Sequence, residues 1–231
     1  MFRIAFEGSD GSGKSTQVEL FNQYISDTLP SCKNGLFHEP RPLRDQIFSE
    51  CKIEGIDDAR ISYLFGVDGY KCRSEELEGN YELIIRDRDT SISQYPYHHN
   101  LGTSDQMIYL MAYLLNKINT VDLVFFFKTD FDVAFKRIMD RAAKKDAGQK
   151  AVVDYFEKEE KLRKIHQNYI ELFSSPEKLM LMGMDHVRIV TIDANKDIET
   201  MKQEVITKFH ENVCIHEKIR SFSFDLNEEV K

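Results

Sequence analysis

Residues 6–17 read FEGSDGSGKSTQ, in which Gly8, Gly13, Lys14 and Ser15 satisfy the pattern G-x-x-x-x-G-K-[ST]. An apolar segment precedes this stretch and a segment with helical periodicity follows it, which is the context that the pattern requires. Glycines allow the backbone N–H groups of such a loop to point at phosphate oxygens. The stretch therefore predicts a strand, a phosphate-binding loop and a helix, in that order.

The whole loop and the first helical turn are candidate ATP-binding residues, with Lys14 reaching the β- and γ-phosphates and the Ser15 hydroxyl on Mg²⁺. Asp87 ends a later apolar segment and is the second candidate magnesium ligand, acting through water. ATP and Mg²⁺ are the expected cofactors. The predicted ATP-binding residues of the loop are Gly8, Ser9, Asp10, Gly11, Ser12, Gly13, Lys14, Ser15 and Thr16.

Apolar segments alternate with helical ones along the chain, which predicts an α/β fold of the P-loop NTPase type: three layers, with helices flanking a five-stranded parallel sheet. Thr103 and Gln106 have capping-box spacing at the start of one helix. We expect a single domain over residues 1–231, with a polar tail from about residue 211. The predicted strands are residues 2–7, 35–38, 82–87, 122–128 and 187–193, and the clearest helices are residues 14–29, 103–119 and 154–173.

The net charge of −8 disfavours a nucleic-acid partner, since nucleic-acid binders usually carry a basic face. No apolar run reaches membrane length, so no membrane partner is expected. The four cysteines have no metal-ligand spacing, and the N-terminus leads directly into a predicted strand. We expect a cytoplasmic protein that binds small-molecule nucleotides. A homodimer is a separate expectation, on which the composition does not bear.

Two further loops should meet the phosphate loop, because the carboxyl ends of parallel strands share one edge of the sheet. The stretch RDRDTSISQY places Arg88 directly after Asp87, where its planar guanidinium suits a phosphate. The stretch FHEPRPLR offers Glu39 and Arg41 at the same edge. A surface salt bridge between Asp87 and Arg88, and a solvated charged turn, are the alternatives at these two places.

These stretches resemble the thymidylate kinase family. FEGSDGSGKSTQ is similar to the family's F-E-G-x-D-G-x-G-K-[ST]-T-Q signature, and DRDTSISQY is similar to its D-R-Y/H…S…Y motif with one residue fewer after Arg88. The resemblance implies transfer of the γ-phosphoryl of ATP to a deoxynucleoside monophosphate. It also implies that Asp10 contacts the acceptor sugar, Arg88 bridges the acceptor phosphate and the transferred group, and Tyr95 disfavours a 2′-OH. Ser91 matches the serine of the motif.

Some family members carry an arginine inside the phosphate loop, where this chain has Gly11 and Ser12. A basic lid over about residues 137–153 is therefore expected to supply cationic charge. We predict that Arg137 binds ATP and that Arg141 stabilises the transferred phosphoryl group. A solvated basic helix end is the alternative, since cations also suit a helix C-terminus.

The family binds its pyrimidine with a segment of the type L-F-A-x-[DN]-R, to which YLFGVDGY at 63–70 is similar. Phe65 keeps the stacking ring, whereas Gly69 stands where the family has its base-binding arginine and leaves space beside the ring. Either another group, such as Lys71 or Arg73, binds the base, or the acceptor base is not ordinary thymine. The expected acceptor is dTMP or a 5-substituted dUMP.

Two other functions remain open. A deoxynucleoside kinase phosphorylates a neutral 5′-OH, and Glu39 would then be its general base. A non-enzymatic ATP-binding regulatory module is the third possibility, although the chain retains Lys14, Ser15, Asp87 and Arg88.

Overall fold

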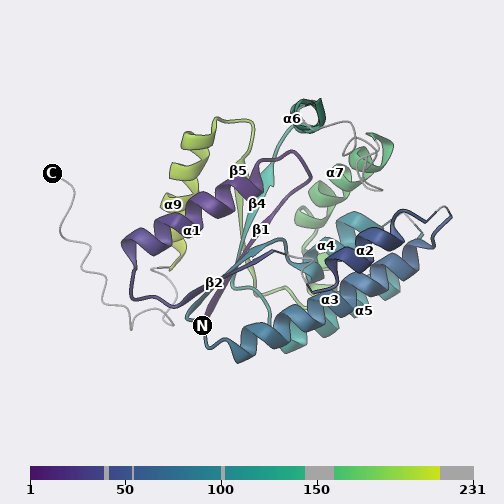
Figure 1. Cartoon of the computed structure of the whole chain (residues 1–231), viewed down its shortest axis with the longest axis horizontal. Coiled ribbons are helices and arrows are strands. Elements are labelled where there is room, and N and C mark those ends of the chain that lie inside the picture. The colour runs from purple at the N-terminus through teal and green to yellow at the C-terminus, as the bar shows by residue number, and fades with distance from the viewer. Residues whose placement is uncertain (39–41, 54, 100–101, 144–158, 214–231) are drawn as a thin grey trace.

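The computed structural model describes residues 1–38, 42–53, 55–99, 102–143 and 159–213 (Figure 1). Its centre is a five-stranded sheet in the order β2-β3-β1-β4-β5, and every neighbouring pair is parallel. The fold is therefore the α/β, P-loop NTPase type that the alternating pattern predicts. The strands are β1 (Phe2–Glu7), β2 (Asn34–His38), β3 (Leu83–Asp87), β4 (Leu123–Lys128) and β5 (Arg188–Asp193).

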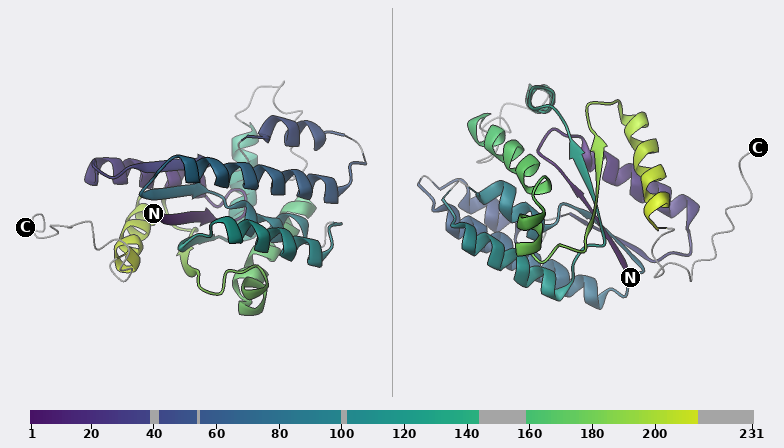
Figure 2. Two further views of the ribbon diagram at one scale, coloured as in Figure 1. Left: turned by 90° about the horizontal axis from the view of Figure 1, so that it is seen from below. Right: turned by 180° about the vertical axis from the view of Figure 1, so that it is seen from behind.

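Helices cover both faces of the sheet, as the two further views show (Figure 2). On one face, α1 (Lys14–Thr28) and α9 (Ile198–Val213) pack on apolar side chains of β1, β3 and β4. On the other face lie α4 (Thr90–His98), α5 (Asp105–Ile118) and α7 (Glu159–Phe173). The remaining described helices are α2 (Arg44–Glu50), α3 (Asp58–Glu78), α6 (Phe131–Ala143) and α8 (Pro176–Leu181).

The strand predictions are correct to within one residue at each end. The helix predictions for residues 14–29 and 103–119 are also confirmed, but the cap of α5 is not the one expected. Ser104, rather than Thr103, accepts a hydrogen bond from the backbone N–H of Met107 at 3.4 Å. Thr103 Oγ1 instead donates to Asp58 Oδ2 at 2.8 Å, because its side chain points into the protein.

Some predicted features lie outside the described residues: most of the lid (residues 144–153), the start of the third helix (154–158) and most of the tail (214–231). The single-domain prediction also stays a prediction. Among the described helices, none combines the length and apolar character that a membrane span needs.

The register of the sheet brings three chain segments to one edge. Phe6 on β1 and His38 on β2 both pair with Asp87 on β3. The phosphate loop after β1 and the turn after β3 therefore start side by side, at the carboxyl edge where open α/β sheets bind ligands.

Candidate active site

The phosphate loop is shaped by glycines in the left-handed region of backbone space. Gly13, with φ 85°, precedes α1, and no described side chain caps this helix end, which leaves its first N–H groups for an anion. Gly11 has φ 80°, and a Cβ added there would lie 2.2 Å from the carbonyl oxygen of Ala134 on α6. Only glycine fits this close approach of loop and helix.

The loop brings Asp10 and Lys14 to Arg88 from the turn after β3. Arg88 Nη2 lies 2.5 Å from Asp10 Oδ1, and Lys14 Nζ lies 3.9 Å from the same oxygen. Burial pushes the pKa of Asp10 upward, but the charges of Arg88 and Lys14 outweigh it and hold that pKa below its usual value. Burial and the charge of Arg88 lower the pKa of Lys14. Lys14, Arg88, Arg141 and Asp10 are the residues predicted to be catalytic, and the first, second and fourth of them are thus neighbours.

Arg88 is held in an unusual backbone conformation, with φ 74°. A left-handed conformation costs a residue with a side chain roughly 1–2 kcal/mol, so other contacts must hold it. Arg88 Nη1 donates to Gly8 O at 3.1 Å and to Tyr169 Oη at 2.9 Å, and the guanidinium lies 5.0 Å from the ring centre of Tyr97. Burial lowers the pKa of Arg88, yet the negative potential of Tyr97 and Asp10 raises it well above the usual value.

The candidate magnesium ligands also meet at this edge. Burial raises the pKa of Asp87, but a hydrogen bond from His38, the charges of Lys14 and Arg88 and the neighbouring Ser15 hydroxyl hold it well below the usual range, so the carboxylate is ionised. Its Oδ2 contacts His38 Nδ1 at 3.2 Å, and that hydrogen bond raises the pKa of His38. Its Oδ1 is buried and has no hydrogen-bond partner among the described residues.

The Ser15 hydroxyl and the Asp87 carboxylate suit a hard divalent cation. Mg²⁺ binds one or two protein oxygens and takes its other ligands from water and phosphate. Within the described residues, no three His, Cys, Asp or Glu side chains form a cluster that could hold a metal by themselves. The donors present therefore fit Mg²⁺ bound together with a nucleotide.

A pocket of about 790 Å³ opens beside the loop and extends to α6 and the start of α9. Arg137 and Arg141 of α6 line it, together with Lys196 and Met201. Arg137 Nη1 donates to the carbonyl oxygens of Ala194 at 2.9 Å and Gly11 at 3.4 Å. Arg141 contributes a positive charge that also lowers the pKa of Asp10. The pocket is large enough for a nucleotide-sized ligand.

Ser91 and Tyr95 do not face this site. Both are buried on α4, where Ser91 Oγ contacts Asn116 Oδ1 at 2.8 Å and Tyr95 Oη donates to Glu171 Oε1 at 2.9 Å. Two residues further along the helix, Ser93 Oγ lies 3.5 Å from Tyr169 Oη, and Tyr97 faces the phosphate loop. A shift of two residues turns a helix by about 200°. Ser93 and Tyr97 therefore lie on the face of α4 opposite to that of Ser91 and Tyr95.

Tyr97 Oη donates to Asp10 Oδ2 at 3.0 Å, so Tyr97 is the tyrosine beside the predicted sugar-binding carboxylate. Tyr95, expected at the acceptor, therefore lies away from Asp10, and Tyr97 is the tyrosine of α4 that contacts this carboxylate. Helix periodicity alone could not show this, since both pairs have the same spacing.

Phe65 lies on α3 beside His98, with ring centres 5.8 Å apart, and packs on the cluster that contains Tyr97. The expected space at Gly69 is not present, because a Cβ there would lie 2.8 Å from Thr90 Cβ. Arg73 is fully buried and bonds to Asp89, so it is not a base-binding residue. Glu39 and Arg41 lie outside the described residues.

Glu7 is a functional candidate that the sequence analysis missed. It is fully buried at the end of β1, where it accepts hydrogen bonds from Tyr169 Oη at 2.8 Å and from the Asp89 N–H at 2.6 Å. Burial raises its pKa to about 7. The signal available in the sequence was its position as the charged residue that ends the first apolar strand, directly before the phosphate loop.

Comparisons with known proteins agree with this geometry. The family model described as thymidylate kinase matches residues 6–205. A thymidylate kinase of Kosmotoga olearia is 27% identical, with 89% of this chain and 94% of that protein covered. A thymidylate kinase of Mycoplasma capricolum is 28% identical, with 93% and 97% covered.

A solved structure of deoxyadenosine kinase from M. mycoides with bound dATP shares the fold, with a TM-score of 0.58 and 20% identity. The alignment covers 90% of this chain and all of that one. A family match over most of the chain, together with a complete phosphate loop and a buried arginine beside it, establishes the relationship. The chain belongs to the thymidylate kinase family of ATP-dependent nucleoside monophosphate kinases.

Proposed function

We propose that this protein transfers the γ-phosphoryl of MgATP to a deoxynucleoside monophosphate, with dTMP or a 5-substituted dUMP as acceptor. The observation that supports this most directly is the cluster of Arg88, Asp10 and Lys14 beside the phosphate loop. A doubly charged acceptor phosphate needs cations at this place, whereas a neutral 5′-OH does not.

In this proposal the acceptor phosphate oxygen forms a bond to the γ-phosphorus while the bond from that phosphorus to the β–γ bridging oxygen breaks, releasing ADP. The acceptor is already ionised, so alignment and charge neutralisation do most of the work. Lys14 contacts the β- and γ-phosphates, Arg88 holds the acceptor and transferred phosphates, and Arg141 adds charge from α6. Asp10 orients Arg88 and the acceptor sugar.

The loop residues and Arg137 would hold ATP in the adjoining pocket, and Ser15 and Asp87 would hold Mg²⁺. The bound ion would supply charge neutralisation between the β- and γ-phosphates. Asp87 fits this role because its carboxylate is ionised and one of its oxygens is buried without a described partner.

On the acceptor side, Tyr97 packs by the sugar and Phe65 stacks on the base. Tyr97 would crowd a 2′-OH because its hydroxyl is already fixed on Asp10. Phe65 is half-buried beside His98, which leaves part of its ring for a ligand.

The test is an ADP-release assay across dTMP, dUMP, 5-substituted dUMPs, dCMP, dGMP, dAMP and the matching nucleosides. We expect a deoxynucleoside monophosphate to exceed every nucleoside and dTMP or a 5-substituted dUMP to rank first. Lys14→Ala should lower kcat by about 100-fold or more without unfolding the protein. Wild-type turnover in that variant would contradict phosphoryl transfer at this loop.

A deoxynucleoside kinase remains the second candidate, and the same assay separates the two. If a nucleoside ranks first and Glu39→Gln abolishes its phosphorylation, Glu39 is a general base and the proposal is wrong. If Glu39→Gln leaves monophosphate turnover largely intact, no such base is needed.

We also propose a cytoplasmic homodimer. Large apolar side chains are exposed on two helices that pack side by side: Tyr63, Tyr70 and Leu77 on α3, and Leu110 and Leu114 on α5. Exposed apolar surface of this extent is typical of a protein interface. The four cysteines are scattered along the sequence without the spacing of a disulfide framework, which supports a reducing compartment.

A further inference from the structure

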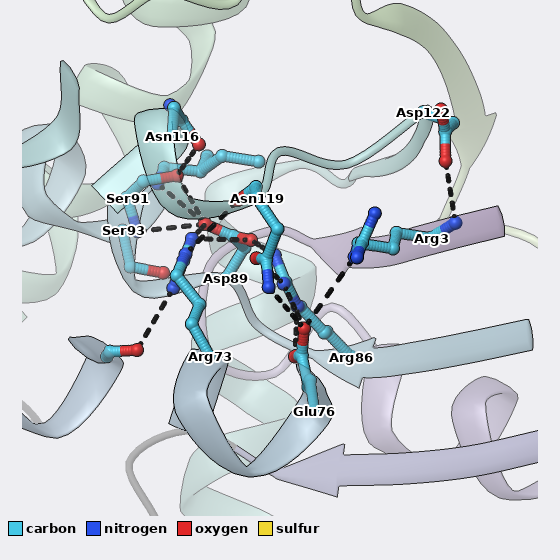
Figure 3. A network of polar contacts seen from close by, with 12 residues as sticks. Arg3, Arg73, Glu76, Arg86, Asp89, Ser91, Ser93, Asn116, Asn119 and Asp122 are labelled. Carbon is cyan, nitrogen blue, oxygen red and sulfur yellow. Dashed lines mark hydrogen bonds and ion pairs between the residues drawn. The ribbon is translucent and has the colours of Figure 1, made fainter. Parts of the chain in front are cut away.

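A buried ionic network joins Arg86 and Asp89, the residues on either side of Asp87 and Arg88 in the sequence (Figure 3). Arg86 immediately precedes these two residues and Asp89 immediately follows them. Arg86 Nη1 donates to Asp89 Oδ2, and both side chains are fully buried. An ion pair therefore links the residues on either side of Asp87 and Arg88, which are proposed to hold the metal and the acceptor phosphate.

A second arginine connects this turn to α3, the helix of Phe65, which is proposed to stack on the base. Arg73 of α3 donates from Nη2 to both carboxylate oxygens of Asp89, at 2.9 and 3.1 Å. Its Nη1 also lies 3.4 Å from the carbonyl oxygen of Gly69, one turn earlier on α3. Phe65 lies one further turn back on the same helix. Asp89 is thus the residue through which α3 is attached to the turn that carries Arg88.

The remaining groups of the network satisfy Arg86 rather than Asp89. Arg86 donates to Glu76 at 2.7 and 2.6 Å and to Asn119 Oδ1 at 2.6 Å. Two buried arginines therefore face two buried carboxylates, those of Glu76 and Asp89. Because buried charges are tolerated only when paired and hydrogen-bonded, each group in this network restricts the others to one geometry.

Asp89 is fixed through its main chain as well. Its N–H donates to Glu7 Oε1 at 2.6 Å, and its carboxylate accepts from the Ser91 N–H at 2.8 Å, which starts α4. Arg88 lies between two fixed residues in a left-handed conformation, with φ 74°. Strained backbone of this kind persists where the surrounding contacts over-determine it.

We propose that Asp89, fixed by Arg73, is a positioning residue that holds Arg88 in line with the acceptor phosphate and couples this alignment to the base-binding helix. The inference rests on the proposed role of Arg88.

The test compares two variants that each neutralise one carboxylate of the same network. Asp89→Asn weakens the attachment of Arg88, whereas Glu76→Gln weakens the end that does not touch Asp89. The wild type is first assayed to identify the best acceptor, and kcat, acceptor KM and the affinity for a non-hydrolysable ATP analogue are then measured for each. Thermal unfolding identifies an assay temperature at which both variants remain folded.

We expect Asp89→Asn to lower kcat by about 10- to 100-fold and to raise the acceptor KM, since small misplacements of a catalytic group have effects of this size. The affinity for the ATP analogue should stay within about twofold, because the loop keeps its shape. Glu76→Gln should lose a similar amount of stability but keep most of its kcat. Equal losses of kcat in both variants, or full kcat in Asp89→Asn, would overturn the proposal.

Arg73 provides a second pair of variants if Asp89→Asn does not fold. Arg73→Lys keeps a cation for Asp89 and should retain more kcat than Arg73→Met, which should show the same pattern as Asp89→Asn. Equal kcat in the two would overturn the proposal. Because the acceptor ranking is measured first, a wrong acceptor in the proposed function is recognised separately from a failure of Asp89 to position Arg88.

Discussion

Each carboxylate oxygen of Asp10 has its own partner, Arg88 on Oδ1 and Tyr97 on Oδ2. Tyr97→Phe removes one of them, and a hydrogen bond to a charged group contributes roughly 1.5–3 kcal/mol. We expect kcat/KM for the deoxynucleotide acceptor to fall by about tenfold or more, with weaker discrimination against the ribonucleotide. The measurement is steady-state kinetics with both acceptors.

Tyr95→Phe is the matched control on the same helix. It removes a hydroxyl that bonds to Glu171 rather than to Asp10, so we expect a loss of about 1 kcal/mol of stability and little change in kcat/KM. If Tyr95→Phe impaired the acceptor reaction and Tyr97→Phe did not, Tyr95 rather than Tyr97 would be the tyrosine that acts on the acceptor.

Glu7 should make stability depend on pH. Its pKa rises from 4.5 to about 7 on burial, so between these values the folded chain holds a proton that the unfolded chain has lost. The free energy of unfolding therefore falls as pH rises through this window. The stabilisation that protonated Glu7 adds to the free energy of unfolding is complete below about pH 4.5 and is lost above about pH 7. Its size is on the order of 3 kcal/mol.

Glu7→Gln keeps a neutral group at every pH. We expect this variant to gain about 2–3 kcal/mol relative to the wild type between pH 5 and pH 8, measured by urea unfolding at both values. If the free energies of unfolding of the wild type and the variant changed equally with pH, Glu7 would not titrate in this range.

At the scale of single elements, α3 and α4 touch at Gly69 and Thr90. Alanine in place of a glycine inside a helix normally stabilises it by about 1 kcal/mol. Here the added Cβ would lie 2.8 Å from Thr90 Cβ and 3.0 Å from its Cγ2. We expect Gly69→Ala to destabilise the protein by about 1–3 kcal/mol in urea unfolding. A stabilised variant would mean that the two helices separate readily.

The elements themselves were largely predictable. Apolar segments of strand length mark β1 to β5, since strands covered on both faces carry few polar residues. The phosphate loop was predictable because its chemistry fixes residue types at fixed spacing. Helix faces were not: Tyr95 and Tyr97 are chemically identical candidates, and only packing against Glu171 or Asp10 separates them. The burial of Arg73 likewise depends on Asp89, which lies 16 residues away along the chain.

At the scale of the whole molecule, the proposed homodimer can be tested on its apolar face. Leu114 of α5 is 55% exposed, so a charge there costs the monomer little. We expect Leu114→Lys to shift the protein from dimer to monomer in light scattering coupled to gel filtration, with no loss of thermal stability at low protein concentration. If Leu114→Lys remained a dimer, the interface would lie elsewhere. If the wild type were a monomer, the proposed homodimer would be wrong.

The strand order has a consequence for how the chain reaches this fold. β1 is synthesised before both of its partners, β3 and β4, and lies between them at the centre of the sheet, so that Phe2 pairs with Leu83 and Ile4 with Leu123. More than half of the chain must leave the ribosome before both edges of β1 can be hydrogen-bonded. Pairings between residues this far apart slow folding. Until they form, β1 is an apolar segment with two open edges, the part of the nascent chain on which a chaperone would act first.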